Sequence, residues 1–275
     1  MPKVLAAALL ALALPAQAAL DESVLRAPVV SGLEQAYIEV TVFKPDGPGP
    51  FPIVVLSHGS PRSAEDRRSE GRQRLAAQSR RFVQMGFAVL VPTRRGYGES
   101  GGSWAESYGT CRNPDYHAAG LETARDLGAA VDAVRGEPWA DTGRVVLAGQ
   151  SAGGFGSVAA ASQGMKGVVA VVNFAGGRGS QGPDDVCGEA RLVEAMGRYG
   201  RGARVPGLWV YSVNDRFFGP SLARRMHAAF VHAGGEAQLF EAPAIGDDGH
   251  GYFARAMDDW SPRVAAFLRR VGAAP

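Results

Sequence analysis

The chain has 275 residues, of which 46% are hydrophobic and 20% are charged. This length is enough for one large domain with a substantial core. The 29 basic residues nearly balance the 27 acidic ones, which argues against nucleic acid as the main partner.

The first predicted element is a secretory signal peptide at residues 1–18. Lys3 supplies a positive charge, residues 4–14 form an apolar stretch too short to cross a bilayer, and residues 15–18 place alanines at the cleavage positions. No later stretch is long and apolar enough to span a membrane. We therefore expect cleavage after Ala18 and a periplasmic or secreted protein that is not inserted in a membrane.

Strand and helix patterns alternate along the rest of the chain. Short apolar or alternating runs predict strands at residues 37–43, 52–57, 87–91, 144–148, 168–174, 208–213 and 237–241. Helical composition or spacing predicts helices at about residues 70–85, 118–134, 157–162, 189–199, 221–233 and 252–271, where Pro262 could interrupt the last. This alternation predicts a single α/β domain over residues 19–275, with a mostly parallel sheet and helices on both faces.

Two irregular insertions interrupt the pattern, at about residues 94–114 and 178–204. Both follow predicted strands, so we expect them to lie over the carboxyl ends of the strands and cover a site there. Trp104, Tyr108 and Tyr116 are candidates for a substrate pocket, although aromatic side chains also serve as ordinary packing groups.

Arginines are frequent in two places. Residues 62–81 are arginine-rich but broken up by acids, which predicts the solvated face of a helix. Arg94 follows a strand and is a candidate for binding a substrate carboxylate. The alternative is that it braces nearby carbonyl groups or an acid.

The sequence Gly-Gln-Ser-Ala-Gly at residues 149–153 carries the clearest chemical signal. It lies between an apolar strand and a helix-compatible segment, the setting of a nucleophile elbow, which presents a serine from a strained turn. The pattern recurs at residues 98–102, but the strand there ends too early and two glycines after Ser100 oppose a helix. Ser151 is therefore the predicted nucleophile, and Ser100 is predicted to be a loop residue.

A serine hydroxyl needs a base and a group that orients this base. Asp215 follows the strand at residues 208–213, and His250 follows the last strand between two glycines. The order serine, acid, histidine predicts that Ser151, Asp215 and His250 form a catalytic triad. Asp247 and Asp248 are rivals for the acid, but they are too close in sequence to His250 to orient its ring from behind.

The oxyanion of an acyl-transfer intermediate needs preorganised donors. The backbone N–H of Ala152, directly after the nucleophile, is one candidate. The N–H of Ser60, in the loop after the strand at residues 52–57, is the other. His58 in this loop is predicted to be a bracing residue.

Cys111 and Cys187 are the only cysteines, one in each insertion. Sequence alone does not show whether they meet. An exported protein can keep a disulfide, which favours a bond over two free thiols. There is no cluster of cysteines and histidines at metal-binding spacing, and we expect no metal.

Together, the segments 56–59, 95–100, 149–153, 214–215 and 248–250 resemble the α/β-hydrolase superfamily, in particular serine enzymes similar to dienelactone hydrolases and prolyl oligopeptidases. The resemblance implies an eight-stranded, mostly parallel sheet with one antiparallel strand near the N-terminus, and no cofactor. Dienelactone hydrolases carry a cysteine where this chain has Ser151, which counts against a dienelactone substrate.

These patterns predict an exported serine hydrolase that cleaves carboxylic esters through an acyl-enzyme. The expected partner is a small-molecule ester. Two alternatives remain at this point: a peptidase or amidase with the same triad, and a binding protein on a hydrolase scaffold that has no activity.

Overall fold

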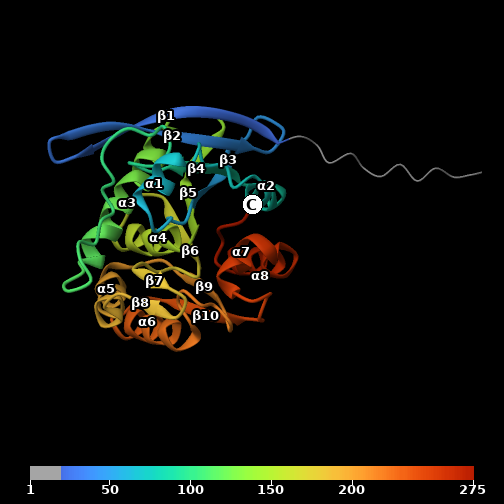
Figure 1. Ribbon diagram of the computed structural model, residues 1–275. Helices are drawn as coiled ribbons and strands as arrows, with labels where there is room; N and C mark the ends of the chain where they lie inside the picture. Colours follow the sequence, from blue (N-terminus) through green and yellow to red (C-terminus); the bar gives the residue numbers. More distant parts are fainter. Residues whose placement is uncertain (1–19) are drawn as a thin grey trace, which may run out of the picture.

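A central sheet organises the computed structural model, which describes residues 20–275 (Figure 1). The predicted signal peptide lies outside the described residues. The strands of the sheet follow the order β1-β2-β4-β3-β5-β6-β9-β10. Their bounds are β1 Asp21–Ser31, β2 Glu34–Lys44, β3 Phe51–Ser57, β4 Ala88–Thr93, β5 Ala140–Gln150, β6 Val168–Phe174, β9 Gly207–Ser212 and β10 Ala237–Ala242. A small second sheet pairs β7 (Ser180–Gly182) with β8 (Asp185–Val186).

One strand runs against the others. β2 is antiparallel to both of its neighbours, β1 and β4, whereas the pairs from β4 to β10 are parallel. The predicted mostly parallel sheet is confirmed. Strand β1 was not predicted from the sequence. Its exposed apolar residues Val24 and Val30 obscure the alternation that would mark a half-buried strand.

Helices cover both faces of the sheet, as predicted (Figure 1). Their bounds are α1 Ala64–Ser69, α2 Ala76–Gln84, α3 Tyr116–Asp132, α4 Ala152–Ser162, α5 Glu189–Gly202, α6 Pro220–His232, α7 Tyr252–Arg255 and α8 Met257–Arg270. Helices α3 to α6 enclose one hydrophobic core against the sheet, with Leu127, Phe155, Met196 and Phe230 among its members. Helices α2, α7 and α8 enclose the other, around Phe82, Phe253 and Trp260.

The arginine-rich segment differs from the prediction. Instead of one helix from residue 70, it contains α1, capped by the Ser63 hydroxyl, and α2, which begins only at Ala76. Arg72 and Arg74 between the helices pair with Glu22 on β1. The segment is therefore not simply a solvated face, because several of its charges are used in contacts that the local sequence does not reveal.

The C-terminal helix is broken, but at Ala256 rather than at Pro262. Trp260 Nε1 donates to Phe253 O at 2.9 Å across this break, and the buried indole fixes the start of α8. Pro262 stays inside α8. Within residues 20–275, no helix combines the length and apolar character that crossing a bilayer requires.

Candidate active site

Ser151 occupies a strained turn between β5 and α4. Its φ is 57° and its ψ is −123°, a conformation that a residue with a side chain rarely adopts. A Cβ on Gly149 would lie 2.5 Å from Gly153 C, and a Cβ on Gly153 would lie 2.2 Å from Ser57 O. Only glycine allows β5, α4 and the end of β3 to approach this closely. The sequence around Ser151 thus forms the sharp turn that its glycines predict.

Asp215 and His250 come together at the ends of β9 and β10. Asp215 is buried, and its Oδ2 lies 3.1 Å from His250 Nδ1. Its other oxygen accepts from the N–H groups of Phe217 (2.7 Å) and Phe218 (2.9 Å). Because Nδ1 faces the carboxylate, it carries the proton and leaves His250 Nε2 as the basic nitrogen.

Neighbouring groups fix the histidine loop beside the serine turn. Gln150, the residue before Ser151, donates from Nε2 to His250 O at 3.1 Å. The Phe217 ring stacks on the imidazole with 4.0 Å between the ring centres. Asp248 accepts the backbone N–H of His250 at 2.9 Å, so this acid braces the loop and not the ring. The geometry favours Asp215 as the orienting acid.

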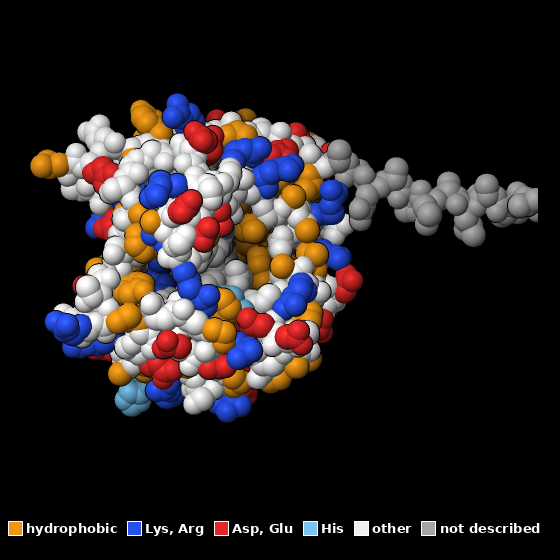
Figure 2. Space-filling model, viewed as in Figure 1, with side chains coloured by type: hydrophobic (Ala, Val, Ile, Leu, Met, Phe, Trp, Pro, Cys, Tyr) orange, Lys and Arg blue, Asp and Glu red, His pale blue; other side chains and the backbone are white. Residues whose placement is uncertain are grey.

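A cavity of about 180 Å³ opens at Ser151, and Figure 2 shows the hollowed face of the molecule. Residues from both insertions line it, including Trp104 and Tyr108 from the first and residues 178–181 from the second. Ala152 and Ser60, the predicted oxyanion donors, line the same cavity. The structure therefore brings the candidate nucleophile, donors and aromatic groups to one place.

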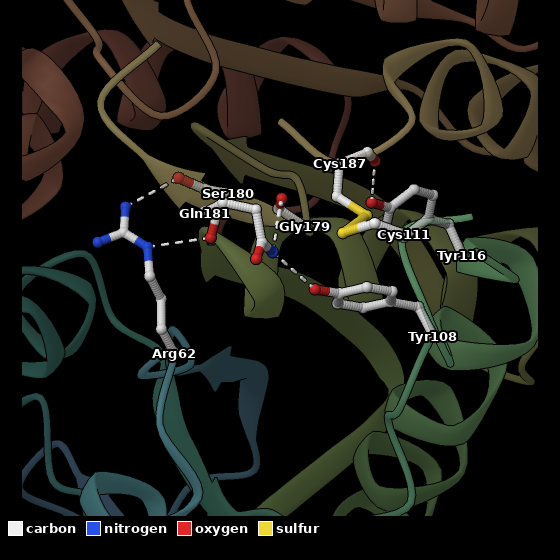
Figure 3. Close-up of a disulfide and its surroundings, with 8 residues drawn as sticks. All are labelled: Arg62, Tyr108, Cys111, Tyr116, Gly179, Ser180, Gln181 and Cys187. Carbon is white, nitrogen blue, oxygen red and sulfur yellow. Dashed lines mark hydrogen bonds between the residues drawn. A yellow bond between two sulfur atoms is a disulfide. The ribbon is translucent and has the colours of Figure 1, made fainter. Parts of the chain in front are cut away.

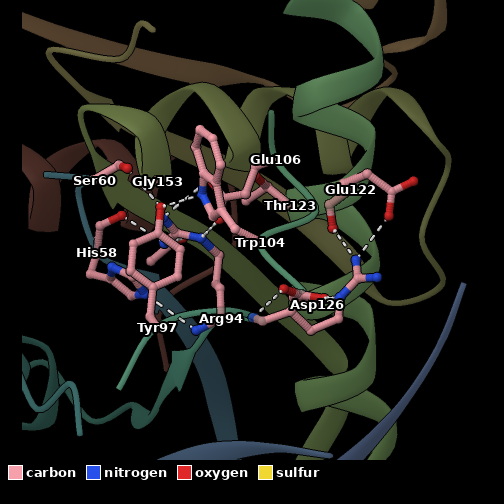
Figure 4. Close-up of polar contacts among 12 residues, drawn as sticks. His58, Ser60, Arg94, Tyr97, Trp104, Glu106, Glu122, Thr123, Asp126 and Gly153 are labelled. Carbon is pink, nitrogen blue, oxygen red and sulfur yellow. Dashed lines mark hydrogen bonds and ion pairs between the residues drawn. The ribbon is translucent and has the colours of Figure 1, made fainter. Parts of the chain in front are cut away.

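The loop that contains Ser60 is held by a chain of hydrogen bonds. Trp104 Nε1 donates to Tyr97 Oη at 3.2 Å, and Tyr97 Oη donates to Ser60 Oγ at 2.7 Å (Figure 4). His58 binds Gly59 O through Nδ1 at 2.7 Å and accepts the N–H of Arg94 at 3.3 Å. Burial lowers the pKa of His58 well below its usual range, so the ring is neutral. His58 thus has the predicted bracing role.

Arg94 and Tyr116 are not where a substrate could reach them. Arg94 is fully buried, donates to Ser57 Oγ (3.0 Å) and His58 O (2.7 Å), and pairs with Glu106. Tyr116 is buried and donates to Cys187 O. The expected substrate contacts of these two residues are therefore corrected to a bracing role for Arg94 and a packing role for Tyr116.

Glu106 is a buried residue that the sequence analysis did not single out. It pairs with both Arg94 and Arg178. Burial by itself would raise the pKa of this carboxyl, but the two guanidinium groups outweigh burial and hold the pKa at about 2. The only signal in the sequence is an acid in a glycine-rich insertion, which does not distinguish a buried group from a solvated one.

The two insertions are joined covalently. Cys111 and Cys187 form a disulfide, and its neighbourhood connects the two loops by further bonds (Figure 3). Gln181 Nε2 donates to Tyr108 Oη at 3.0 Å. Tyr108 and Tyr116 pack with 5.0 Å between ring centres. The cover of the cavity is thus a cross-linked unit.

Solved structures show the same fold. An acylaminoacyl peptidase of Pyrococcus horikoshii matches with a TM-score of 0.67 and 16% identity over 92% of this chain, which spans only 42% of that protein. A Pyrococcus furiosus esterase matches with a TM-score of 0.62 and 16% identity, covering 91% of this chain and 90% of that one. A Klebsiella pneumoniae protein assigned as a dienelactone hydrolase matches with a TM-score of 0.60 and 15% identity, covering 91% and 98%.

The sequence comparisons place the chain in a family. No curated protein matches it. The family model for X-Pro dipeptidyl-peptidases (S15 family) matches residues 34–219, which include Ser151 and Asp215. The α/β-hydrolase resemblance is confirmed. This chain belongs to the S15 family of the α/β-hydrolases.

Proposed function

We propose that this protein is an exported esterase that forms an acyl-enzyme on Ser151, with His250 as the base and Asp215 as the group that orients it. The observation that carries the proposal is the 3.1 Å contact between His250 Nδ1 and Asp215 Oδ2 beside a serine at positive φ. These are the nucleophile, base and orienting acid that acyl transfer requires.

The reaction follows from the placement of these groups. His250 Nε2 takes the Ser151 hydroxyl proton while Ser151 Oγ attacks the ester carbonyl carbon. The N–H groups of Ala152 and Ser60 stabilise the oxyanion. As the carbon–oxygen bond to the alcohol breaks, His250 returns the proton to the leaving oxygen. Water then attacks the acyl-enzyme with His250 again as base, which releases the acid and restores Ser151.

Peptide cleavage is the second candidate, because the matching family is that of X-Pro dipeptidyl-peptidases. An enzyme that removes dipeptides binds a substrate with a free ammonium group, and a carboxylate in the site is the natural partner for this charge. Among the described residues that line the cavity there is no aspartate or glutamate. The cavity therefore favours esters over peptides with a free N-terminus.

Two chromogenic substrates test this choice. We expect the purified protein to hydrolyse p-nitrophenyl butyrate and to leave glycyl-prolyl-p-nitroanilide nearly untouched. The Ser151→Ala variant serves as the blank and should lose at least about 1,000-fold in kcat, as triad nucleophiles do. Faster cleavage of the anilide would favour the peptidase. An ester rate that is equal in the wild type and the variant would overturn the mechanism.

Export is part of the proposal and has its own test. The Cys111–Cys187 disulfide is compatible with an oxidising compartment. Expressed with its full sequence in a bacterium, the protein should appear in the periplasm or medium, and its N-terminal residue should be Ala19. Recovery of the uncleaved chain from the cytosol would contradict export without affecting the esterase assignment.

A further inference from the structure

We propose that the cavity at Ser151 selects esters that carry a carboxylate of their own. This inference rests on the proposed esterase function and adds the substrate class. Three arginines, Arg62, Arg67 and Arg178, line the cavity, and the described lining residues include no acidic side chain. A cleft whose walls carry more cations than anions attracts a negatively charged ligand.

Arg178 is buried and belongs to a group of ionised side chains with Glu106 and Arg94. Its Nη2 donates to Glu106 and to Thr123 Oγ1, the latter at 2.8 Å. The same Glu106 carboxylate also neutralises Arg94, so one negative charge serves two guanidinium groups. Arg178 Nε is buried and has no hydrogen-bond partner among the described residues. Within this group of three ionised side chains, two positive charges share one negative charge.

Arg62 carries a second uncompensated charge. Its Nε donates to Ser180 O at 2.9 Å and its Nη2 to Ser180 Oγ at 2.8 Å (Figure 3). Both partners are neutral, and Arg62 forms no ion pair with a carboxylate within residues 20–275. Nη1 has no partner among these residues, which leaves one N–H donor group available for an incoming anion.

A stack of rings places this charge close to the reacting groups. The Arg62 guanidinium lies 4.4 Å from the centre of the Phe217 ring. Phe217 in turn stacks on His250 at 4.0 Å. A carboxylate held by Arg62 would thus lie within the reach of one small ester whose carbonyl carbon is at Ser151.

Arg67 adds a third cation that has only neutral partners. Its Nη1 donates to Pro61 O (3.1 Å) and Arg62 O (3.0 Å). Its guanidinium lies 3.7 Å from the centre of a Trp104 ring, which also lines the cavity. Through these bonds Arg67 fixes the backbone of Arg62. Planar guanidinium groups held in this way are suited to carboxylate recognition.

Matched pairs of small esters provide the test. The first pair is 4-acetoxybenzoate and 4-acetoxybenzamide, with the carboxylate on the alcohol side. The second is phenyl 4-carboxybenzoate and phenyl 4-carbamoylbenzoate, with the carboxylate on the acyl side. Each kcat/KM is divided by the rate constant of hydroxide-catalysed hydrolysis of the same ester, which removes intrinsic reactivity. We expect at least one pair to show a preference of about tenfold or more for the anion, the usual scale of one charge-assisted hydrogen bond.

Variants of the arginines assign the preference to its source. Arg62→Gln should reduce the ratio of anionic to neutral kcat/KM to below about threefold, because the substitution removes the charge and keeps a polar side chain. Arg68→Gln is the matched control, since Arg68 is an exposed residue of α1 outside the cavity lining, and it should keep the wild-type ratio. Circular dichroism verifies that both variants are folded. An unchanged ratio in Arg62→Gln would overturn the role of this residue.

Binding without turnover separates this inference from the esterase proposal. In calorimetry, the Ser151→Ala variant should bind terephthalate at least about tenfold more tightly than terephthalamide. Equal affinities would overturn the inference. Hydrolysis of the neutral esters without a preference for the anions would overturn it too, while leaving the esterase function intact. Failure to hydrolyse any ester would instead contradict the proposed function.

Discussion

The chain contains the pattern Gly-x-Ser-x-Gly twice, and the structure gives the two serines opposite environments. Ser151 lies in a strained turn at φ 57° and faces the cavity. Ser100 is buried, donates its hydroxyl to Thr93 O at 2.6 Å, and accepts the N–H of Glu39 at 3.0 Å. The Ser151 hydroxyl faces the cavity. The Ser100 hydroxyl instead hydrogen-bonds to the backbone of β2 and β4 and so holds its loop against these strands.

The surroundings of the glycines in each copy show how the same sequence motif occurs in two different structures. A Cβ on Gly153 would collide with backbone at 2.2 Å, so this position requires glycine. Gly102 corresponds to Gly153 in the second copy, but its φ is 83° and a Cβ on it would first meet a side-chain atom, Glu34 Oε1, at 3.0 Å. Gly101, which precedes it, has no positive φ, and a Cβ there would find its nearest neighbour, Tyr37 O, at 3.4 Å. A close backbone approach does not by itself mark the nucleophile, because a Cβ on Gly98 in the second copy would also lie 2.6 Å from Glu70 O. The motif is informative only where a strand precedes it and a helix follows it directly.

The largest expected contrast is in catalysis. Ser151→Ala should lower ester kcat by at least about 1,000-fold, because it removes the nucleophile. Ser100→Ala should leave the rate within a few-fold of the wild type and should cost about 1 kcal/mol in the free energy of unfolding, since the Glu39 N–H loses its acceptor. Rates on p-nitrophenyl butyrate and urea unfolding of both variants measure the two effects. A similar rate loss in both variants would remove the distinction between the serines.

The disulfide closes a loop that contains only one of the two serines. Its ends are separated by 76 positions, and the closed loop contains Ser151 but not Ser100. Replacing Cys111 and Cys187 with serine should lower the free energy of unfolding by about 4 kcal/mol in the chain-entropy model. It should also raise KM more than it lowers kcat, because the cover of the cavity loosens.

A reductant provides the control for this prediction. Reduction should lower the unfolding temperature of the wild type and leave that of the double variant unchanged. Coincident unfolding curves for the oxidised wild type and the double variant would show that the bond contributes nothing to stability.

The comparison of the glycines predicts a loss of folding stability in one of two glycine variants but not in the other. Gly153→Ala should destabilise the fold by about 3 kcal/mol, because the new methyl group meets Ser57 O and His58 O in a packed backbone crossing. Gly101→Ala is the matched control and should change the free energy of unfolding by less than about 1 kcal/mol. Thermal unfolding of the two variants checks this order. A tolerated Gly153→Ala would mean that the crossing can widen at little cost.

His58 contacts segments next to both motifs. We expect it to make the stability of the fold depend on pH, which is the smallest of the predicted effects. Its carbonyl contacts the Gly153 position, and its ring accepts the N–H of Arg94, which precedes the second motif. Burial lowers the pKa of His58 in the folded state, whereas the unfolded chain takes up a proton below about pH 6.5. The unfolded state therefore binds more protons in this range, and stability falls as the pH drops below 6.5.

The slope of this loss is up to about 1.4 kcal/mol per pH unit for one proton. Urea unfolding between pH 7 and pH 5 should show a smaller decline for His58→Gln, which has no titrating ring, than for the wild type. Equal declines would assign the acid sensitivity to other groups.

Local patterns were enough to predict most of the fold. Continuous apolar runs marked β3 and β6, because strands covered on both faces have no polar alternation. The turn at Ser151 was predictable because its glycines and flanking elements are adjacent in sequence. Strand β1 was missed, since it pairs only with β2 at the sheet edge and exposes apolar side chains.

The missing parts of the site depend on contacts between distant segments. Glu106 and Arg178 are 72 positions apart, and nothing in either neighbourhood indicates the partner. Arg94 could equally have faced a substrate or a buried acid, and only the tertiary arrangement decides. Stacking of Phe217 on His250 is likewise set by the backbone bonds that Asp215 accepts.

The bond between Cys111 and Cys187 also decides what a single cut in the backbone would do. β5, α4 and β6 all lie between these cysteines, in a covalent ring. If a protease cleaves one peptide bond inside the ring, for example in the exposed turn between β7 and β8, the two fragments stay joined through the sulfur atoms. Ser151 then remains tethered to the segment that carries Asp215 and His250. A cut at a position outside the ring leaves the two fragments without a covalent link.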